Sequence, residues 1–148
     1  MESKYPKRLC HAVPGWVKDG AVFHIRIRVQ REWSGSLIAE GIGEGLLESV
    51  AFNHAKGIWY CRVFMLMPDH VHALLSFDPC RSMSEVIGNW KSYTAKRFGV
   101  SWQSNYFDHR IRHDASLDGK REYVLNNPLA KELCERWEDW KWRWLPDE

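Results

Sequence analysis

Two histidines separated by one residue form the part of the sequence best suited to chemistry. They are His70 and His72, within residues 67–77, which read Met-Pro-Asp-His-Val-His-Ala-Leu-Leu-Ser-Phe. Alternate side chains of a β-strand share a face, so both imidazoles would point the same way. Neutral imidazoles are donors that manganese, zinc and other transition metals accept, but two donors do not complete a site. The pattern predicts a cation site if a third ligand exists elsewhere, and otherwise a polar strand face that binds nothing.

A tyrosine and an asparagine further along the chain can supply the missing groups. Tyr123 and Asn127 lie four positions apart at the end of an expected helix, so they would share a helical face. Pro128 disfavours continued helical geometry at Asn127. A lone tyrosine is ordinarily a core residue. Its combination with Asn127-Pro128 and the histidine strand instead favours a phenol and a carboxamide that project together into a site.

These residues, in this order, resemble the single-tyrosine HUH transposases, and most closely their REP-associated tyrosine transposase branch. The resemblance covers nearly the whole chain and rests on Phe23-His24-Ile25, residues 65–75, Trp102-Gln103 and residues 123–131. Met-Pro before a His-hydrophobic-His element is a fairly specific signal, and its combination with Tyr-x-x-x-Asn-Pro is strong. Asp69 departs from the family, in which asparagine is common at this position, and it adds a negative charge next to the histidine pair.

The resemblance implies a DNA strand transferase, that is, a single-stranded DNA endonuclease that also rejoins strands. A Mg²⁺ or Mn²⁺ ion held by His70, His72 and Asn127 would polarise a phosphodiester, and the Tyr123 hydroxyl would attack phosphorus. The products would be a 5′-phosphotyrosine and a free 3′-hydroxyl. The implied substrate is single-stranded DNA with imperfect hairpins of the repetitive extragenic palindrome (REP) type. The implied process is DNA transposition, a form of DNA recombination, by a monomer or by a homodimer that exchanges tyrosine helices.

Two other classes of function remain open. A catalytically silent relative would bind DNA hairpins with the same sheet and cut nothing. A metal-dependent phosphodiesterase would use water as its nucleophile, and Tyr123 would then be structural. A covalent protein–DNA adduct distinguishes the three classes, because a tyrosine nucleophile retains the phosphoester energy that hydrolysis discards.

The bulk composition is that of an ordinary globular protein. The 148 residues are 45% apolar and 27% charged with a formal charge of +2, and this length predicts one domain over residues 1–148. No apolar run approaches the roughly 20 residues of a membrane-spanning helix. The widely spaced cysteines favour reduced thiols over a structural zinc site. Since no secretory leader precedes the chain, we expect a cytoplasmic, nucleoid-associated protein. The four cysteines are Cys10, Cys61, Cys80 and Cys134.

Hydrophobic periodicity predicts a β-α-β-β-α-β-α order of elements. This order indicates the α+β class, with a small antiparallel sheet and helices packed on one face. The resemblance implies the same architecture, a ferredoxin- or RRM-like palm of the HUH nuclease type. The expected elements are a strand over 21–30, a helix over 36–56, a strand over 58–67, the histidine strand, a helix over 83–98, a strand over 109–113 and a helix from Ser116 or Asp118.

The first expected strand alternates between apolar and basic residues. Its apolar side, which would face the core, is Phe23, Ile25, Ile27 and Val29, and its outward side is His24, Arg26 and Arg28. If the outward side belongs to the sheet face that carries the histidine pair, Arg26 and Arg28 lie beside the cation site. Both arginines would then contact phosphates.

Although the net charge of the whole chain is small, residues 81–113 form a basic segment. This segment holds six lysines and arginines against two carboxylates, a net +4, and aromatic residues are interleaved with them. Such interleaving favours single-stranded DNA, although core aromatics beside solvated cations would give the same pattern. His109 and His113 would have metal-like spacing in a helix, but the strand-like alternation favours contact with the DNA backbone. The predicted DNA contacts in this segment are Lys91, Lys96, Arg97, Arg110 and Arg112.

The two ends of the chain differ in character. Residues 1–20 contain four lysines and arginines and two prolines, which indicates an irregular basic arm, most simply a solvated terminus. Residues 129–148 are rich in tryptophan, with four in the eight residues 137–144. We expect these rings to pack the end of the tyrosine helix onto the body. A flap over a DNA groove is the alternative.

Overall fold

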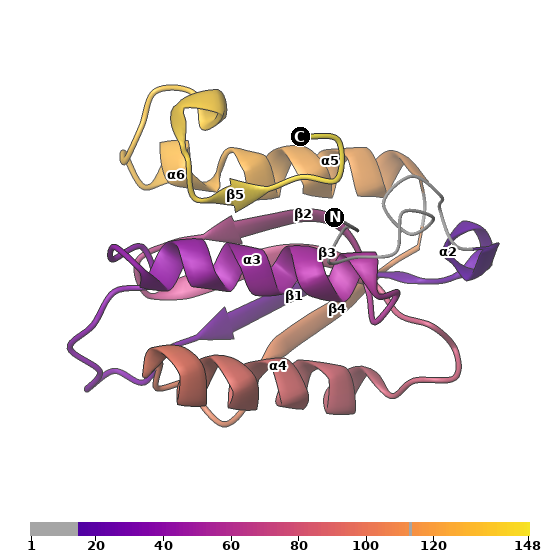
Figure 1. The fold of residues 1–148 in the computed structure, drawn as a ribbon. Coiled ribbons are helices and arrows are strands. Elements are labelled where there is room, and N and C mark those ends of the chain that lie inside the picture. The colour runs from indigo at the N-terminus through magenta and orange to yellow at the C-terminus, as the bar shows by residue number, and fades with distance from the viewer. Residues whose placement is uncertain (1–14, 113) are drawn as a thin grey trace, which may run out of the picture.

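The computed structural model describes residues 15–112 and 114–148. A five-stranded antiparallel sheet lies between helices (Figure 1), and the order of its strands is β4-β1-β3-β2-β5. The elements, in chain order, are α2 (Gly15–Asp19), β1 (Val22–Arg28), α3 (Ile42–Ala55), β2 (Tyr60–Leu66), β3 (His70–Ser76), α4 (Met83–Phe98), β4 (Phe107–Ile111), α5 (Asp114–Leu125), α6 (Asn127–Ala130), the 3₁₀ helix η1 (Trp137–Asp139) and β5 (Arg143–Trp144).

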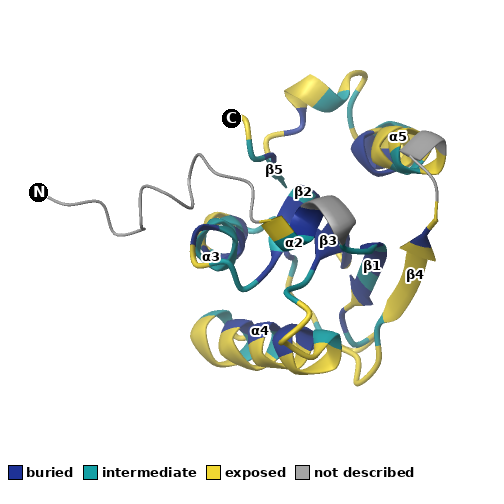
Figure 2. Cartoon of the chain, turned by 90° about the vertical axis from the view of Figure 1, so that its right-hand side faces the viewer, coloured by how far each residue is buried: buried dark blue, intermediate teal, exposed yellow. Residues whose placement is uncertain are grey.

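The predicted α+β class and antiparallel sheet are confirmed, but the prediction that helices cover one face of the sheet is wrong. Helices α3 and α4 cover one face, whereas α5 lies against the other (Figure 2). The first core contains Leu46, Trp90 and Ile25, and the second contains Leu74 and Val124. Because α5 carries buried apolar residues of its own, it needs an apolar surface, and the free face of the sheet provides it.

The central hairpin forms as the sequence predicts. Strands β2 and β3 pair with Leu66 opposite Val71, and Pro68 and Asp69 make the turn between them. Alternate residues of β3 face opposite cores: Val71 packs in the core under α3 and α4, while Leu74 packs in the core under α5. His70 and His72 share the face of Leu74, as strand periodicity requires.

The ends of α4 and the start of α3 follow from particular capping residues and glycines in the sequence. Helix α4 begins after Ser82, whose Oγ accepts a hydrogen bond from the Glu85 N–H at 3.4 Å. It ends at Gly99, whose φ of 74° is the left-handed conformation that glycine adopts most readily. Helix α3 starts later than predicted, at Ile42, because Gly41 has a φ of 86° and interrupts the helical path over residues 36–41.

Other boundaries also depart from the predicted ones. Residues 15–19 form a helix instead of continuing the expected irregular arm, and residues 1–14 of that arm lie outside the described residues. The tyrosine helix begins at Asp114, before Ser116. Within the described part of the chain, each helix is too short or too polar to span a bilayer.

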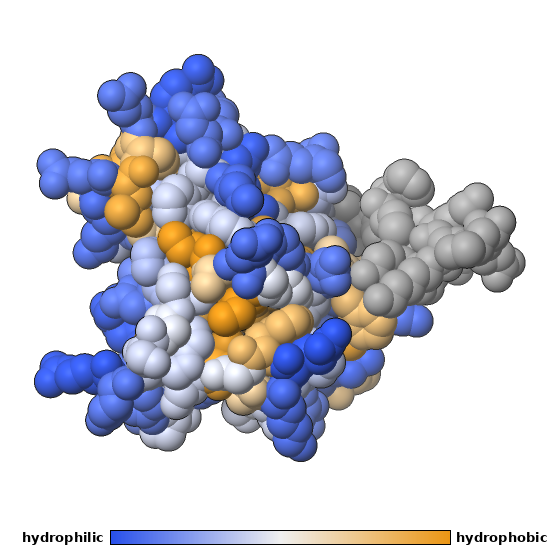
Figure 3. Space-filling view, turned by 60° about the vertical axis from the view of Figure 1, so that its left-hand side comes forward, coloured by the Kyte–Doolittle hydropathy of each residue, from blue (hydrophilic) through white to orange (hydrophobic). Residues whose placement is uncertain are grey.

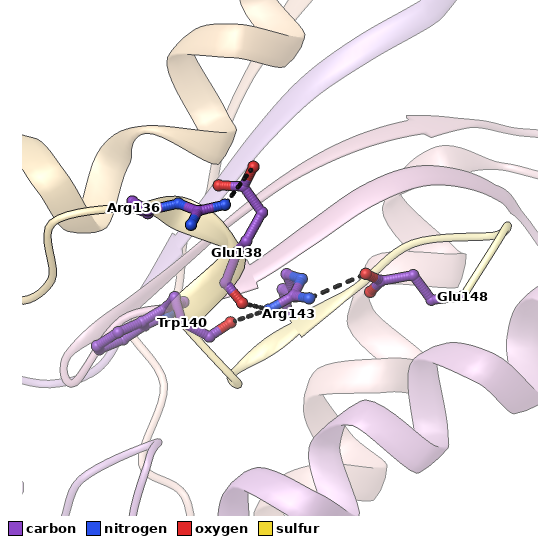
Figure 4. A network of polar contacts seen from close by, with 5 residues as sticks. All are labelled: Arg136, Glu138, Trp140, Arg143 and Glu148. Atoms are coloured by element: carbon purple, nitrogen blue, oxygen red, sulfur yellow. Dashed lines mark hydrogen bonds and ion pairs between the residues drawn. The ribbon is translucent and has the colours of Figure 1, made fainter.

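The tryptophan-rich tail packs on the body, as predicted. Strand β5 pairs with β2, and the Trp140 Nε1–H donates to the Leu66 carbonyl oxygen at 3.0 Å. Arg143 holds the turn before β5, since its Nη1 donates to the carbonyl oxygens of Glu138 and Trp140 at 3.0 and 2.6 Å (Figure 4). Its Nη2 pairs with Glu148 Oε2 at 2.9 Å. The tail therefore closes the outer edge of β2.

The surface mixes charged and apolar groups. In the space-filling view, apolar side chains show through near the middle of the face, and hydrophilic side chains project around its margin (Figure 3). Among the described residues, the large hydrophobic side chains that remain exposed are Tyr93, Phe107, Tyr123 and Leu133.

Candidate active site

The histidine pair lies at the start of β3, on the sheet face that α5 covers. His70 is 6% exposed and His72 is 2% exposed, and their ring centres are 4.9 Å apart with the planes nearly perpendicular. In the pairing with β1, His70 lies opposite Arg28 and His72 lies opposite Arg26. The side chains of directly opposed residues share a face, so both arginines belong to the face of the histidine pair.

Each imidazole of the pair has one nitrogen held by a neighbour. His70 Nδ1 is 2.7 Å from Asp69 Oδ1, and His72 Nδ1 is 3.0 Å from His24 Nε2. The hydrogen bond from His70 keeps the pKa of Asp69 low, so the carboxylate is ionised and accepts a hydrogen bond from His70 Nδ1–H. Such partners orient metal-binding histidines, so in a metal site Nε2 of each residue would be the ligand. Asp69 orients the His70 ring through this hydrogen bond.

His24 is buried rather than outward-facing, which corrects the prediction for the first strand. It is 3% exposed, because α5 covers this part of the sheet. Burial, together with nearby Lys120 and Arg26, lowers the pKa of His24 to about 4. Burial, together with the neighbouring His70 and His24, lowers the pKa of His72 to about 3. Both imidazoles are therefore neutral near pH 7, and when His72 Nδ1–H donates to His24 Nε2, the lone pair of His72 Nε2 is left for a ligand.

Tyr123 projects from α5 over this layer of imidazoles. Its side chain is 52% exposed, and its ring is edge-on to His24 and His72 at centre distances of 6.0 and 5.9 Å. Lys120 Nζ lies 5.5 Å from the centre of the Tyr123 ring. The phenol is therefore both close to the histidine pair and open to a substrate.

The spacing of Tyr123 and Asn127 predicts that both lie on one helix, but Asn127 is the first residue of α6. The chain leaves the tyrosine helix at Asn126, before Pro128. Asn127 is 6% exposed, and its Oδ1 has no hydrogen-bond partner. A buried acceptor without a partner costs about 1–3 kcal/mol. A cation bound beside this oxygen would satisfy it.

One cavity of about 450 Å³ joins these groups. His70, His72, Tyr123 and Asn127 all line it. The described residues contain no group of three His, Cys, Asp or Glu side chains arranged for a metal, so a cation held by the histidine pair would need a third donor of another kind. The Asn127 carboxamide oxygen meets that need, and two imidazoles with one amide oxygen fit a divalent cation. Further lining residues are Arg26, Arg28, Gly35, Ser36, Met67, Pro68, Asp69, Lys131 and Leu133.

The predicted DNA contacts fall into separate regions. Arg26 and Arg28 line the cavity. Lys91, Lys96 and Arg97 lie on α4, behind the sheet relative to the cavity, and Lys91 Nζ donates to the Gln103 carbonyl oxygen at 2.6 Å. Arg97 instead lines a second cavity, of about 510 Å³, between α3 and α4.

The other two predicted contacts lie at the edge of the sheet. Arg110 is an exposed residue of β4, an edge strand of the sheet, and Arg112 follows that strand. Strand β4 spans Phe107–Ile111, close to the predicted strand over 109–113. His109 is therefore in a strand, as expected, and His113 lies outside the described residues.

The sequence reasoning missed several residues of the site. His24 and Lys120 contact the imidazole and phenol layer, and Lys131 and Leu133 line the cavity. His24 alternates with Arg26 on the first strand, so the sequence pattern already placed its side chain on the same strand face as Arg26. Its contact with His72 on β3 could not be predicted, because that contact depends on the register between the two strands. Lys131 follows Asn127 by four positions within the family-like segment, which was the signal for it.

The fold is that of known transposases. The structure of a REP-associated tyrosine transposase bound to a REP hairpin matches with a TM-score of 0.69, at 15% identity, over 84% of this chain and 76% of that one. A proposed transposase from Deinococcus radiodurans R1 matches with a TM-score of 0.52, also at 15% identity, over 85% of this chain and 97% of that one.

The sequence assigns the family. Residues 36–127 match the model of the IS200-like transposases, and the chain belongs to this family. An uncharacterised protein of Haemophilus influenzae is 26% identical over a match that covers 51% of this chain and 58% of that protein. This chain thus aligns with little more than half of that relative's length.

Proposed function

We propose that this protein cleaves and rejoins single-stranded DNA next to REP-type hairpins, with Tyr123 as the nucleophile. The observation that carries the proposal is the setting of Tyr123: an exposed phenol within 6.0 Å of two buried, neutral imidazoles, above a cavity that also holds the unpartnered Asn127 Oδ1. Family membership and the fold of a hairpin-bound relative support the same reaction.

The side chains of the cavity have separate roles in this reaction. Arg26, Arg28 and Lys131 line the cavity and attract the DNA backbone, which brings a phosphodiester to the site. His70, His72 and Asn127 would hold Mg²⁺ or Mn²⁺, which supplies charge stabilisation to the crowded phosphorus. Asp69 and His24 hold the two imidazoles in their orientations.

Tyr123 would replace the 3′-oxygen at phosphorus in a transesterification. Its Oη forms a bond to phosphorus as the bond between phosphorus and the 3′-oxygen breaks. The phenol proton passes to solvent, which the exposed side chain contacts, and the leaving oxygen takes up a proton to become a 3′-hydroxyl. The 5′-phosphotyrosine keeps the phosphoester energy, so a 3′-hydroxyl can reverse the step and rejoin the strand.

Labelled DNA tests the proposal. The substrate is single-stranded DNA with a hairpin, taken from the sequences that flank the protein's own gene, with Mg²⁺ or Mn²⁺ added. A 5′-labelled strand should release a fragment ending in a 3′-hydroxyl, and a 3′-labelled strand should stay attached to protein on denaturing electrophoresis. Peptide mapping should find the nucleotide on Tyr123.

A matched pair of variants assigns the nucleophile. Tyr123→Phe removes one oxygen and almost no volume, so hairpin binding should persist while cleavage falls to background. Tyr93→Phe makes the same change at an equally exposed tyrosine on α4 and should cut normally. Equal cutting by the parent and Tyr123→Phe without an adduct would mean that water is the nucleophile. Hairpin binding without any cutting by the parent would mean a silent binding protein.

A further inference from the structure

Among the described residues, two of the three exposed aromatic rings lie on the sheet face that carries the candidate site. Of the four large hydrophobic side chains that remain exposed among the described residues, Tyr123 and Leu133 line the cavity of the site, and Tyr93 lies on α4 behind the sheet. The fourth, Phe107, is 43% exposed and lies on β4. Single exposed apolar residues are common, but rings grouped around one site need an explanation.

Phe107 belongs to the same face of the sheet as the histidine pair. In the pairing of β1 with β4 it lies directly opposite Arg26, which itself pairs with His72. The Phe107 ring is edge-on to the His24 ring at a centre distance of 5.8 Å. The Tyr123 ring contacts the same imidazole at 6.0 Å. Phe107 and Tyr123 thus both contact His24 and lie less than 12 Å apart.

One cation lies over the Phe107 ring. The Arg26 guanidinium is 4.9 Å from the ring centre, and the His109 side chain shares this face of the sheet because His109 pairs with His24. Lys120 is close enough to His24 to lower its pKa, and it also contacts Tyr123. A partly open aromatic ring bordered by basic groups is the arrangement that binds single-stranded nucleic acid, with a base on the ring and phosphates on the cations.

We infer that Phe107 is a stacking platform for one nucleobase of the DNA strand, close to the phosphodiester that Tyr123 attacks. The inference rests on the proposed function, because it takes the strand to pass over Tyr123. At about 3.4 Å per stacked nucleotide, the separation of the two rings corresponds to a few nucleotides at most. Every base has a π-face, so this subsite accepts different bases and fixes the position of the strand instead of reading its sequence.

Fluorescent base analogues test the platform directly. Full-length Tyr123→Phe protein, which leaves the DNA intact, is titrated with hairpin-bearing strands that carry 2-aminopurine at one position at a time. Stacking on an aromatic ring quenches the fluorescence of 2-aminopurine. Quenching should be strongest at one position within a few nucleotides of the cleavage site. The added change Phe107→Leu should abolish the quenching there and weaken binding about 5- to 150-fold, the range expected for one stacked base.

Two companion variants separate stacking from a merely structural role. Phe107→Trp keeps an aromatic surface and should retain the quenching, whereas Phe107→Leu keeps an apolar cover over His24 but no ring. Tyr93→Leu removes an exposed ring behind the sheet and should leave the quenching unchanged. The dependence of binding on salt should be the same in all variants, because no charge is removed. Thermal unfolding of each variant confirms that it is folded.

The outcomes distinguish the subsite from the proposed reaction. If quenching at that position is unchanged in Phe107→Leu, or if Tyr93→Leu abolishes it equally, the platform is refuted, even when parent protein cleaves DNA through Tyr123. If Phe107-dependent quenching is present and parent protein forms no adduct, the platform stands and the transesterase reaction fails. Strands that show no quenching at any position also refute the platform.

Discussion

The two faces of the sheet bury polar groups in different ways. On the face under α3 and α4, buried donors are satisfied: Trp90 Nε1 donates to Ser49 Oγ at 2.8 Å, and Trp102 Nε1 donates to Thr94 Oγ1 at 2.9 Å. On the face under α5 and the tail, His24 Nδ1, Asn127 Oδ1 and Arg143 Nε are buried without a partner. Among the described residues, all such side-chain atoms lie on this second face.

The difference indicates that the first face mainly stabilises the fold, whereas the second face carries the groups suited to binding a ligand. Satisfied polar groups and a large apolar cluster, which includes Trp59, Phe64 and Trp90, make the first face the main source of folding free energy. The second face keeps neutral imidazoles and an unpaired amide oxygen, which cost stability unless a ligand engages them. Substitutions on the first face should therefore reduce stability, whereas substitutions at the ligand-like groups of the second face should reduce cleavage with little loss of stability.

The first prediction concerns His70 and His72. Either change to alanine should reduce cleavage in Mg²⁺ or Mn²⁺ to background while hairpin binding persists, because basic side chains supply most of the affinity. Asn127→Ala should be milder, since a carboxamide is the weakest of the three donors and water can replace it. Cleavage of labelled strands and gel-shift titration measure the two quantities. Normal cleavage by either histidine variant would remove the metal-site hypothesis.

The second prediction contrasts Trp90 with Asn127. Trp90 is 3% exposed in the first core, so Trp90→Ala should lower the free energy of unfolding by about 3–5 kcal/mol. Asn127→Leu removes an oxygen that has no partner and should stay within about 1 kcal/mol of the parent. Urea denaturation measures both. A larger loss in Asn127→Leu than in Trp90→Ala would overturn the contrast between the faces.

The third prediction is a pH dependence that originates on the second face. The pKa values of His24 and His72 are depressed to about 4 and about 3, below the unfolded value near 6.5, so the unfolded chain binds more protons at mildly acidic pH. Stability should be complete above about pH 6.5 and fall as the pH drops toward 4, by on the order of 3 kcal/mol for each imidazole. Denaturation at a series of pH values measures this loss.

His24→Phe is the control for the pH dependence. It removes one buried imidazole, so its unfolding free energy should fall less steeply below pH 6.5. It should also weaken Mn²⁺ binding about 10- to 100-fold, measured by calorimetry, because His72 loses the neighbour that orients it. A pH slope equal to that of the parent would show that His24 does not contribute.

The fourth prediction compares cations on the two faces. Lys96→Ala, on α4, should weaken binding of many strands alike and lower the salt dependence by about one phosphate contact. Arg28→Ala, in the cavity, should instead harm cleavage more than binding. Binding at several salt concentrations and single-turnover cleavage measure the two effects. If Lys96→Ala leaves both affinity and salt slope unchanged, the DNA does not reach α4.

Features that depend on local geometry could be predicted from the amino-acid sequence. The two-residue period of β3 placed His70 and His72 on one face, Pro68 and Asp69 made the hairpin turn, and Ser82 and Gly99 bounded α4. Each of these follows from backbone geometry or from side chains within a few residues. The order of the motifs along the sequence also indicated the transposase resemblance. The match of residues 36–127 assigns the chain to the IS200-like transposase family.

The tertiary structure alone decided which distant groups meet. The periodicity of residues 114–125 does not specify the sheet face that α5 covers, and that choice buries His24 and brings Tyr123 over His72. The same choice leaves the α4 cations behind the sheet, although the sequence placed them in one basic segment with β4. Long-range packing, unlike strand or helix period, depends on the path of the whole chain, and that path brings Tyr123 next to His24 and His72.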